Sequence, residues 1–190
     1  PRAALEVLQG FLKDNPGNDE ACGLIERILA DEATASQVRF DALDLLLVNY
    51  QAADRSADMV TALQTAIGFG VDAQKLNLYR RTASTLAILG RDEEAIANYT
   101  SLLLMDPADG DALKQIKALS TRCKRYDLRA KALMDAAHAT QDDELRVSHL
   151  AEAAKLYATA LDNRARAIEI YTSVIDTPSI DSSLALVVAH

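Results

Sequence analysis

Histidines and clustered acidic residues are the side chains of this sequence that could bind a metal ion or transfer protons. His138 and His149 lie eleven residues apart, whereas a helical metal pair places both imidazoles on one face within about one turn. The polar segment 140–143 separates them into two predicted helices. Residues 142–144 form an acidic trio, which is typical of a helix start, where acids complement the helix dipole. We therefore expect no metal site.

Candidate nucleophiles are equally isolated. Ser101 and Ser173 fall inside predicted helices, with no base nearby in the sequence. Cys22 and Cys123 are expected to be small buried apolar residues, and two cysteines cannot build a disulfide scaffold. The sequence contains no HExxH, CxxC, GxGxxG, GxSxG or Walker pattern. These observations predict no catalytic residue and no cofactor, and hence a protein that is not an enzyme.

The composition predicts an all-α protein. The chain has 190 residues, 49% of them hydrophobic and 5% aromatic, with seven glycines and four prolines. Apolar residues recur at helical spacing along almost the whole chain, interrupted by short polar clusters, which indicates about eleven helices. The last of these begins near Asp181. Residues 1–5 read as the middle of a helix, so we expect a fragment of a longer protein.

Two segments of the sequence repeat each other. Residues 93–101 read EEAIANYTS and residues 165–173 read ARAIEIYTS, which match at five of nine positions. The offset between them corresponds to two units of about 36 residues, a length in the range of helical repeats. One helix pair cannot bury its apolar face alone, so stacked pairs must share a core.

These residues resemble the tetratricopeptide repeat, a helix–turn–helix unit of about 34 residues. The best match covers residues 76–110 and the second covers residues 150–178, although unit lengths drift along the chain. The packing positions of the repeat fall on Tyr79, Ala83, Leu86, Ala95, Tyr99, Leu102 and Pro107, and then on Leu150, Ala154, Tyr157, Ala167, Tyr171 and Pro178. The resemblance, closest to degenerate bacterial arrays, implies a right-handed superhelical solenoid of antiparallel helix pairs. Residues 1–190 would then form a single array of about five pairs.

Charge is distributed unevenly along the chain. The formal net charge is −8, and residues 1–70 are acidic. Residues 114–131, which we call the basic segment, carry only Asp127 against seven cations: Lys114, Lys117, Arg122, Lys124, Arg125, Arg129 and Lys131. Two interpretations stay open. The basic segment is either a solvated helix–turn–helix edge with bases near a helix end, or a patch facing an acidic partner.

The resemblance also implies where a partner would bind. In tetratricopeptide arrays the first helix of each pair lines a concave groove. That geometry places Asp41 and Asp44 in the groove, followed by Arg80, then Lys114 and Lys117, then Lys155. Arg80 and Lys114 are separated by one repeat length and should project side by side. The family's clamp for a C-terminal carboxylate is not reproduced, because no asparagine follows Lys114 one turn later.

The function expected from the repeat is a non-catalytic scaffold that binds a protein or peptide segment, an acidic one among the candidates, in its groove. The alternative is a periplasmic scaffold segment of a larger secretion or polysaccharide-export protein, and an enzyme with a helical-repeat fold is the third candidate. The acidic balance argues against nucleic-acid binding, and no apolar run is long enough for membrane insertion. We expect a soluble protein, cytoplasmic or periplasmic, that self-associates through exposed array ends.

Overall fold

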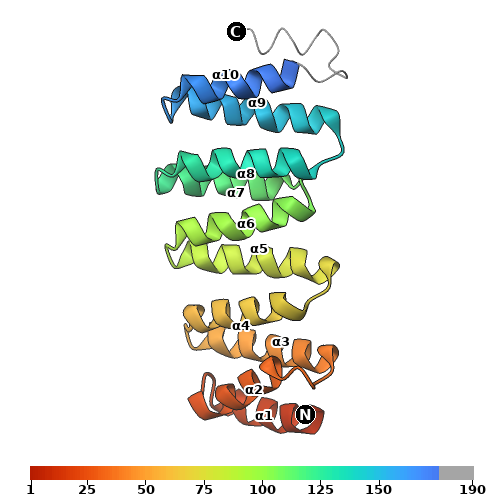
Figure 1. Ribbon diagram of the computed structural model, residues 1–190. Coiled ribbons are helices and arrows are strands. Elements are labelled where there is room, and N and C mark those ends of the chain that lie inside the picture. The colour runs from red at the N-terminus through yellow and green to blue at the C-terminus, as the bar shows by residue number, and fades with distance from the viewer. Residues whose placement is uncertain (176–190) are drawn as a thin grey trace. The chain divides into compact units, whose positions relative to one another are not determined.

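The computed structural model describes residues 1–175, and it confirms the predicted all-α class (Figure 1). Ten helices and no strand occur in this part of the chain. The helices are α1 (Arg2–Asp14), α2 (Asp19–Ala30), α3 (Ser36–Ala52), α4 (Ser56–Phe69), α5 (Asp72–Ile88), α6 (Asp92–Met105), α7 (Gly110–Arg122), α8 (Tyr126–Ala139), α9 (Asp143–Thr159) and α10 (Arg164–Ile175). The expected helix near Asp181, and the repeat position at Pro178, lie outside the described residues.

The helices form two compact units. The first comprises Pro1–Gly90 with α1 to α5, and the second begins at Arg91 and contains α6 to α10. Within the first unit each helix packs against the next one in the chain, and α1 also packs on α3 and α2 on α4. Within the second unit consecutive helices pack in the same way, and α6 also packs on α8. Successive helices of each unit run back and forth (Figure 1). This neighbour and next-but-one pattern is typical of stacked helix pairs.

A left-handed backbone residue marks one turn in every two. Such residues, with φ between 47° and 72°, precede α2, α4, α6, α8 and α10, and they are Gly17, Asp54, Gly90, Lys124 and Asp162. They recur once in every repeat unit of about 36 residues. None of the other connections among the described helices contains a residue with positive φ. The left-handed turns therefore mark five successive pairs of helices along the chain, and the boundary between the two units falls within the third.

Two of these turn positions are glycine, which adopts positive φ without steric cost. At Gly17 a second constraint applies, because a Cβ atom built there would lie 2.4 Å from the Cβ atom of Ala53. The first turn of the chain thus approaches the second turn closely. The three non-glycine turn residues instead accept the cost that a side chain adds in this region of backbone space.

Arginine occupies the N-cap position after three of these turns. Arg55, Arg91 and Arg125 have nearly the same backbone angles, with φ from −99° to −85° and ψ from 55° to 63°. An arginine cannot accept a hydrogen bond from the helix N–H groups as a usual cap does. Its guanidinium instead reaches forward to a carboxylate in the first turn, Asp58 after Arg55 and Glu94 after Arg91. The shared geometry and the shared residue type make this N-cap a feature of the repeat.

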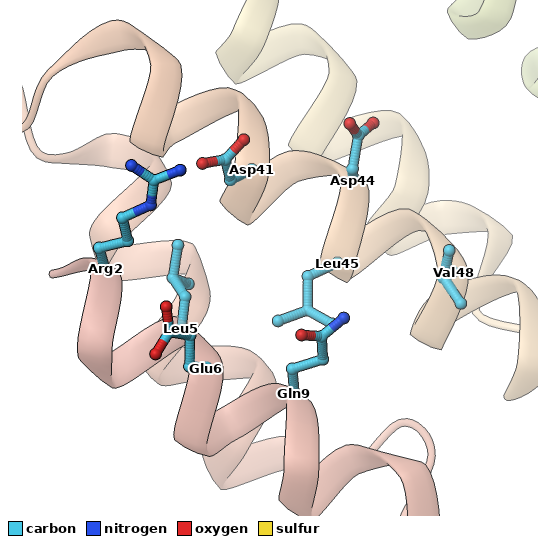
Figure 2. Close-up of a pocket in the computed structure, with 8 residues that line it drawn as sticks. All are labelled: Arg2, Leu5, Glu6, Gln9, Asp41, Asp44, Leu45 and Val48. Carbon is cyan, nitrogen blue, oxygen red and sulfur yellow. The ribbon is translucent and has the colours of Figure 1, made fainter.

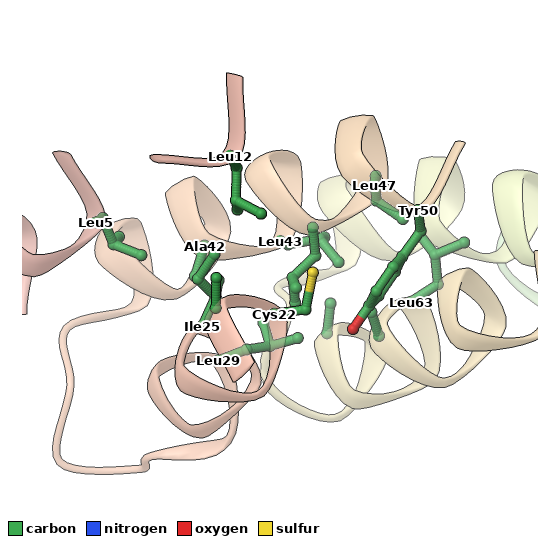
Figure 3. Packing of buried hydrophobic residues seen from close by; sticks show 14 of the residues in the cluster. Leu5, Leu12, Cys22, Ile25, Leu29, Ala42, Leu43, Leu47, Tyr50 and Leu63 are labelled. Atoms are coloured by element: carbon green, nitrogen blue, oxygen red, sulfur yellow. The ribbon is translucent and has the colours of Figure 1, made fainter. Parts of the chain in front are cut away.

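Leucine and isoleucine side chains from α1, α2, α3 and α4 fill the core of the first unit, as Figure 3 shows. Tyr50 is fully buried in this core, and its hydroxyl donates a hydrogen bond of 2.5 Å to Glu26. Burial and this carboxylate raise the pKa of Tyr50 above its ordinary value. Arg39 is also buried, with its Nε donating to the Leu29 carbonyl at 2.7 Å and its guanidinium 3.7 Å from the Phe69 ring centroid.

Alanine contributes more to the core of the second unit than to that of the first. Ala130, Leu133, Ala153 and Leu156 form a buried cluster between α8 and α9. Small side chains at these positions let neighbouring helices approach closely, which is the packing that the repeat pattern predicts.

The repeat positions differ in how deeply they are buried. Ala83, Ala95, Tyr99, Ala154 and Ala167 are buried, together with Leu86 and Leu102. Leu150, Pro107 and the tyrosines Tyr79, Tyr157 and Tyr171 are only partly buried. The small-residue positions thus lie at the closest helix contacts, while most of the aromatic positions keep an edge toward solvent.

Candidate functional site

A hollow in the first unit lies between α1 and α3. It has a volume of about 460 Å³, within the range of sites that hold a side chain or small ligand. Figure 2 shows the side chains of α1 facing those of α3 across it. We call it the α1–α3 hollow, and its lining residues are Arg2, Leu5, Glu6, Gln9, Asp41, Asp44, Leu45 and Val48.

The α1–α3 hollow combines an acidic rim with apolar surface. Glu6 comes from α1, and Asp41 and Asp44 come from successive turns of α3. Leu45 and Val48 supply the apolar surface, and Val48 is 68% exposed although it is aliphatic. A rim of carboxylates over aliphatic side chains suits a ligand that carries a positive charge on an apolar stem.

Two contacts fix the acids of α3. Asp41 accepts a hydrogen bond of 3.0 Å from Gln37 one turn earlier, and Asp44 lies 4.0 Å from the guanidinium of Arg81 on α5. In Figure 2 the guanidinium of Arg2 extends toward Asp41. The Asp44 side chain remains 76% exposed, so its contact with Arg81 leaves most of the carboxylate accessible.

Asp41 and Asp44, both predicted as groove residues, thus lie in one hollow. Arg80 is half-buried on α5, one residue before Arg81. Lys114 and Lys117 are exposed on α7, and Lys155 is exposed on α9. Arg80 belongs to the first unit and the three lysines to the second. The predicted side-by-side arrangement of Arg80 and Lys114 stays a prediction.

Arginines of the basic segment are held by carboxylates of neighbouring helices. Arg122 binds Asp92 at the start of α6 through its Nε atom and one terminal nitrogen. Arg125 lies 2.6 Å from Glu93 and 2.8 Å from Asp127. Arg129, which is buried, pairs with Glu152 of α9. An acidic partner would have to compete with these internal carboxylates.

The lysines of the basic segment differ from its arginines. Lys114, Lys117, Lys124 and Lys131 are exposed, and no ion pair links them to another residue within 1–175. The positive charge that this segment offers to a partner therefore resides on its four lysines. The three arginines instead tie helices together, an outcome that neither interpretation of the sequence included.

The two histidines and the acidic trio at residues 142–144 occupy structural positions. His149 is buried, and its Nε2 lies 2.9 Å from the Pro107 carbonyl oxygen, which can only accept, so Nε2 carries the proton. His138 is exposed near the end of α8. Asp142 caps α9 by accepting hydrogen bonds from the N–H groups of Glu144 and Leu145. Within 1–175, no group of three or more His, Cys, Asp or Glu side chains is placed to hold a metal ion.

Sequence reasoning missed the α1 side of the hollow. Arg2, Glu6 and Gln9 line it, but none of them falls in the best repeat matches. A signal does exist, because aligning α1 with α3 by their last residues places Glu6 on Asp44 and Leu5 on Leu43. That alignment needs the helix ends, which lie among irregular polar clusters and are hard to locate in a sequence.

The ion pair between Asp92 and Arg122 predicts an acid-sensitive contribution to stability. The hydrogen bonds from Arg122 hold the pKa of Asp92 below its ordinary value of 3.8. The stabilisation is therefore present above that value and is lost as the pH falls through the lower pKa of the folded state. We expect Asp92→Asn to destabilise the second unit at neutral pH, with a difference from the parent chain that shrinks toward about pH 3.

Hydrogen exchange of peptides from α6 and α7, measured in both proteins across this pH range, checks the expectation. A difference between the two proteins that stays constant down to the lowest pH would contradict it. Glu144→Gln at the exposed start of α9 serves as a control for the loss of one negative charge.

No protein-family model matches the chain, and no curated protein matches it either. Among the described residues, none of the helices combines the length and the apolar character that crossing a bilayer requires. The likeness to tetratricopeptide repeats thus depends on the residues and turns described above.

Proposed function

We propose that the chain is a non-catalytic interaction scaffold of the tetratricopeptide-like type, and that the α1–α3 hollow binds a segment of a partner protein. The single observation that carries the proposal is this hollow, in which Glu6, Asp41 and Asp44 surround exposed aliphatic surface on two first helices of consecutive pairs. First helices are the ones that the resemblance assigns to the concave groove.

The five regularly spaced left-handed turns support the repeat architecture on which this function depends. Their spacing of about 36 residues is close to the length of the tetratricopeptide unit. A right-handed solenoid of helix pairs is the arrangement that we propose for the chain as a whole. Such a solenoid presents one helix of each pair on its inner face, which creates a continuous binding surface.

The chemistry of the hollow favours a lysine or arginine side chain of an extended peptide. Carboxylates stabilise a cationic head group by charge-assisted hydrogen bonds, and Leu45 and Val48 can cover its methylene stem. The hollow contains three carboxylates against Arg2, with Arg81 adjacent to Asp44, so an added cation improves the local charge balance. The partner proposed for the first unit is therefore basic. An acidic partner segment remains a proposal for the exposed lysines of the second unit.

Fluorescence anisotropy with a series of short labelled peptides tests this proposal. The peptides share one aliphatic sequence and differ in a central Lys, Arg, Gln or Glu. We expect the Lys and Arg peptides to bind more tightly than the Gln peptide and to weaken with added salt. Asp41→Asn with Asp44→Asn should weaken binding of the Lys peptide by about tenfold, since it removes two charge-assisted contacts.

The matched control is Glu20→Gln with Glu32→Gln, which makes the same change in net charge at exposed sites outside the hollow. Equal loss of binding in both double variants would show that net charge alone attracts the peptides. Preference for the Glu peptide would overturn the proposed ligand chemistry.

A further inference from the structure

The first helix presents an open apolar stripe. Ala4, Leu8 and Phe11 follow one another at helical spacing on α1, with Val7 beside them. Ala4 is exposed, Leu8 is half-buried, and Phe11 and Val7 are 47% and 73% exposed. A phenylalanine and a valine in solvent on one helix face mark a surface that is suited to packing. We call these four residues the α1 stripe.

Later first helices bury the corresponding positions. When the helices are aligned by their last residues, the positions of Ala4, Leu8 and Phe11 are occupied by Ala42, Leu46 and Asn49 in α3, by Ala112, Ile116 and Leu119 in α7, and by His149, Ala153 and Leu156 in α9. All nine of these residues are buried. In α5 the first two positions, Leu78 and Thr82, are buried and the third, Thr85, is half-buried. Ala4, Leu8 and Phe11 therefore lie on the repeat's packing face, which is open on α1 alone among the described first helices, and Val7 borders that face.

The contacts of these helices show what normally covers that face. α1 already packs against its own partner α2 and against α3. What α3, α5, α7 and α9 have in addition is the second helix of the pair before them, namely α2, α4, α6 and α8 respectively. The residues that are buried on α3, α7 and α9 but open on α1 are those that such a preceding second helix covers. The natural occupant of the α1 stripe is thus a second helix of the same kind.

α10 is a second helix with the matching open face. From α4 onward, the fifth residue of the second helices is Val60 in α4, Ile96 in α6, Ala130 in α8 and Ile168 in α10. The first three are at most 2% exposed, whereas Ile168 is 65% exposed. α4, α6 and α8 each pack against a first helix that follows them in the chain. Ile168 therefore lies on the face that, in the earlier pairs, meets the next first helix.

We propose that two copies of this chain associate head to tail, with α10 of one copy seated on the α1 stripe of the other. The contact repeats the packing of α8 on α9 and brings Ile168 of one copy to Val7 and Phe11 of the other. It does not involve the α1–α3 hollow, so it is independent of the proposed function. A contact between two different faces leaves one face of each kind open, and association continues into longer chains as the concentration rises.

Sedimentation velocity of the 190-residue chain over a range of concentrations tests the proposal. We expect species larger than the monomer to grow with concentration. Phe11→Glu and, separately, Ile168→Glu should each weaken association by at least about tenfold, because each places a charge in an apolar contact. Val7→Glu is a second variant of the same face, and far-UV circular dichroism verifies that each variant keeps its helices.

Mixing the two variants distinguishes this contact from a symmetric one. The Phe11→Glu protein retains Ile168, and the Ile168→Glu protein retains the α1 stripe. Together they have one intact pair of faces, so the mixture should form a dimer that grows no further, although each protein alone stays monomeric. A symmetric contact of α1 with α1 would respond to Phe11→Glu only, so the Ile168→Glu protein alone would still dimerise.

Val48→Glu is the matched control, since it places the same charge at an exposed aliphatic residue outside the α1 stripe and should leave association unchanged. A parent chain that stays monomeric at every concentration overturns the proposal. Association that persists in both face variants, or a mixture that fails to dimerise, overturns it as well.

Discussion

Replacing Tyr50 with alanine is expected to lower the free energy of unfolding of the first unit by about 3–5 kcal/mol, the usual cost of removing a large buried aromatic side chain. Tyr50 is fully buried where α3 packs on α2. Its ring centroid lies 4.8 Å from the guanidinium carbon of Arg55, and its hydroxyl binds Glu26. The alanine would leave a cavity and remove both contacts. Hydrogen exchange of peptides from α2, α3 and α4 measures the loss in the unit that contains the substitution.

Tyr50→Phe separates the ring from the hydroxyl. The ring and its packing remain, and the lost hydrogen bond to a carboxylate should cost about 1–3 kcal/mol. Exchange of peptides from α8 and α9 serves as the internal reference, because those helices belong to the second unit. Equal destabilisation by Tyr50→Phe and Tyr50→Ala would contradict the expectation, since it would mean that packing of the ring contributes nothing.

Removing the carboxylate of Glu152 should have the second largest effect. Arg129 is buried on α8, where only 11% of its side chain is exposed, and Glu152 of α9 is its partner. Glu152→Ala leaves the guanidinium buried without this charge, which costs several kcal/mol in a fully enclosed pair. Because 46% of the Glu152 side chain is exposed, water compensates in part. We expect a loss of about 1–3 kcal/mol in the second unit.

A double-mutant cycle tests the pairing itself. Arg129 stands at the position that alanine occupies as Ala95 in α6 and as Ala167 in α10, when the helices are aligned by their first residues. Arg129→Ala therefore introduces a residue that the repeat already accepts there. The double variant with Glu152→Ala should be less destabilised than the sum of the single variants. Additive losses, measured by urea unfolding and by exchange of α8 and α9 peptides, would show that the two side chains do not interact.

Most of the fold can be predicted from the helical spacing of apolar residues. Apolar residues at helical spacing predict nearly all of the described helices, since that spacing depends only on local geometry. The helix-pair repeat was also accessible, because Ala95, Tyr99 and their counterparts at Ala167 and Tyr171 recur at a fixed offset. The left-handed turns could not be predicted as a set, because Gly17, Asp54 and Lys124 share a backbone conformation but not a residue type.

Contacts between one helix pair and the next were much harder to predict from the sequence. Arg122 reaches Asp92 across 30 residues and Arg129 reaches Glu152 across 23, separations that follow no single repeat length. The sequence displays the basic segment as an excess of charge because the neutralising carboxylates lie on other helices. For the same reason Asp41 and Asp44 could be assigned to a groove, while Glu6, which faces them from α1, could not.

The left-handed turns also bear on how such a chain can evolve. The turn 123–125 fixes its backbone with a residue of positive φ, so an insertion there would disrupt a pair. The connections between pairs, such as residues 106–109, contain no such residue. The interval from Lys124 to Asp162 is longer than that from Gly90 to Lys124 because α9 has 17 residues where α7 has 13. Recombination that joins genes at these connections exchanges whole helix pairs and preserves every turn. A pair bounded in this way is a structural module, and its duplication would lengthen the array without a new fold having to arise.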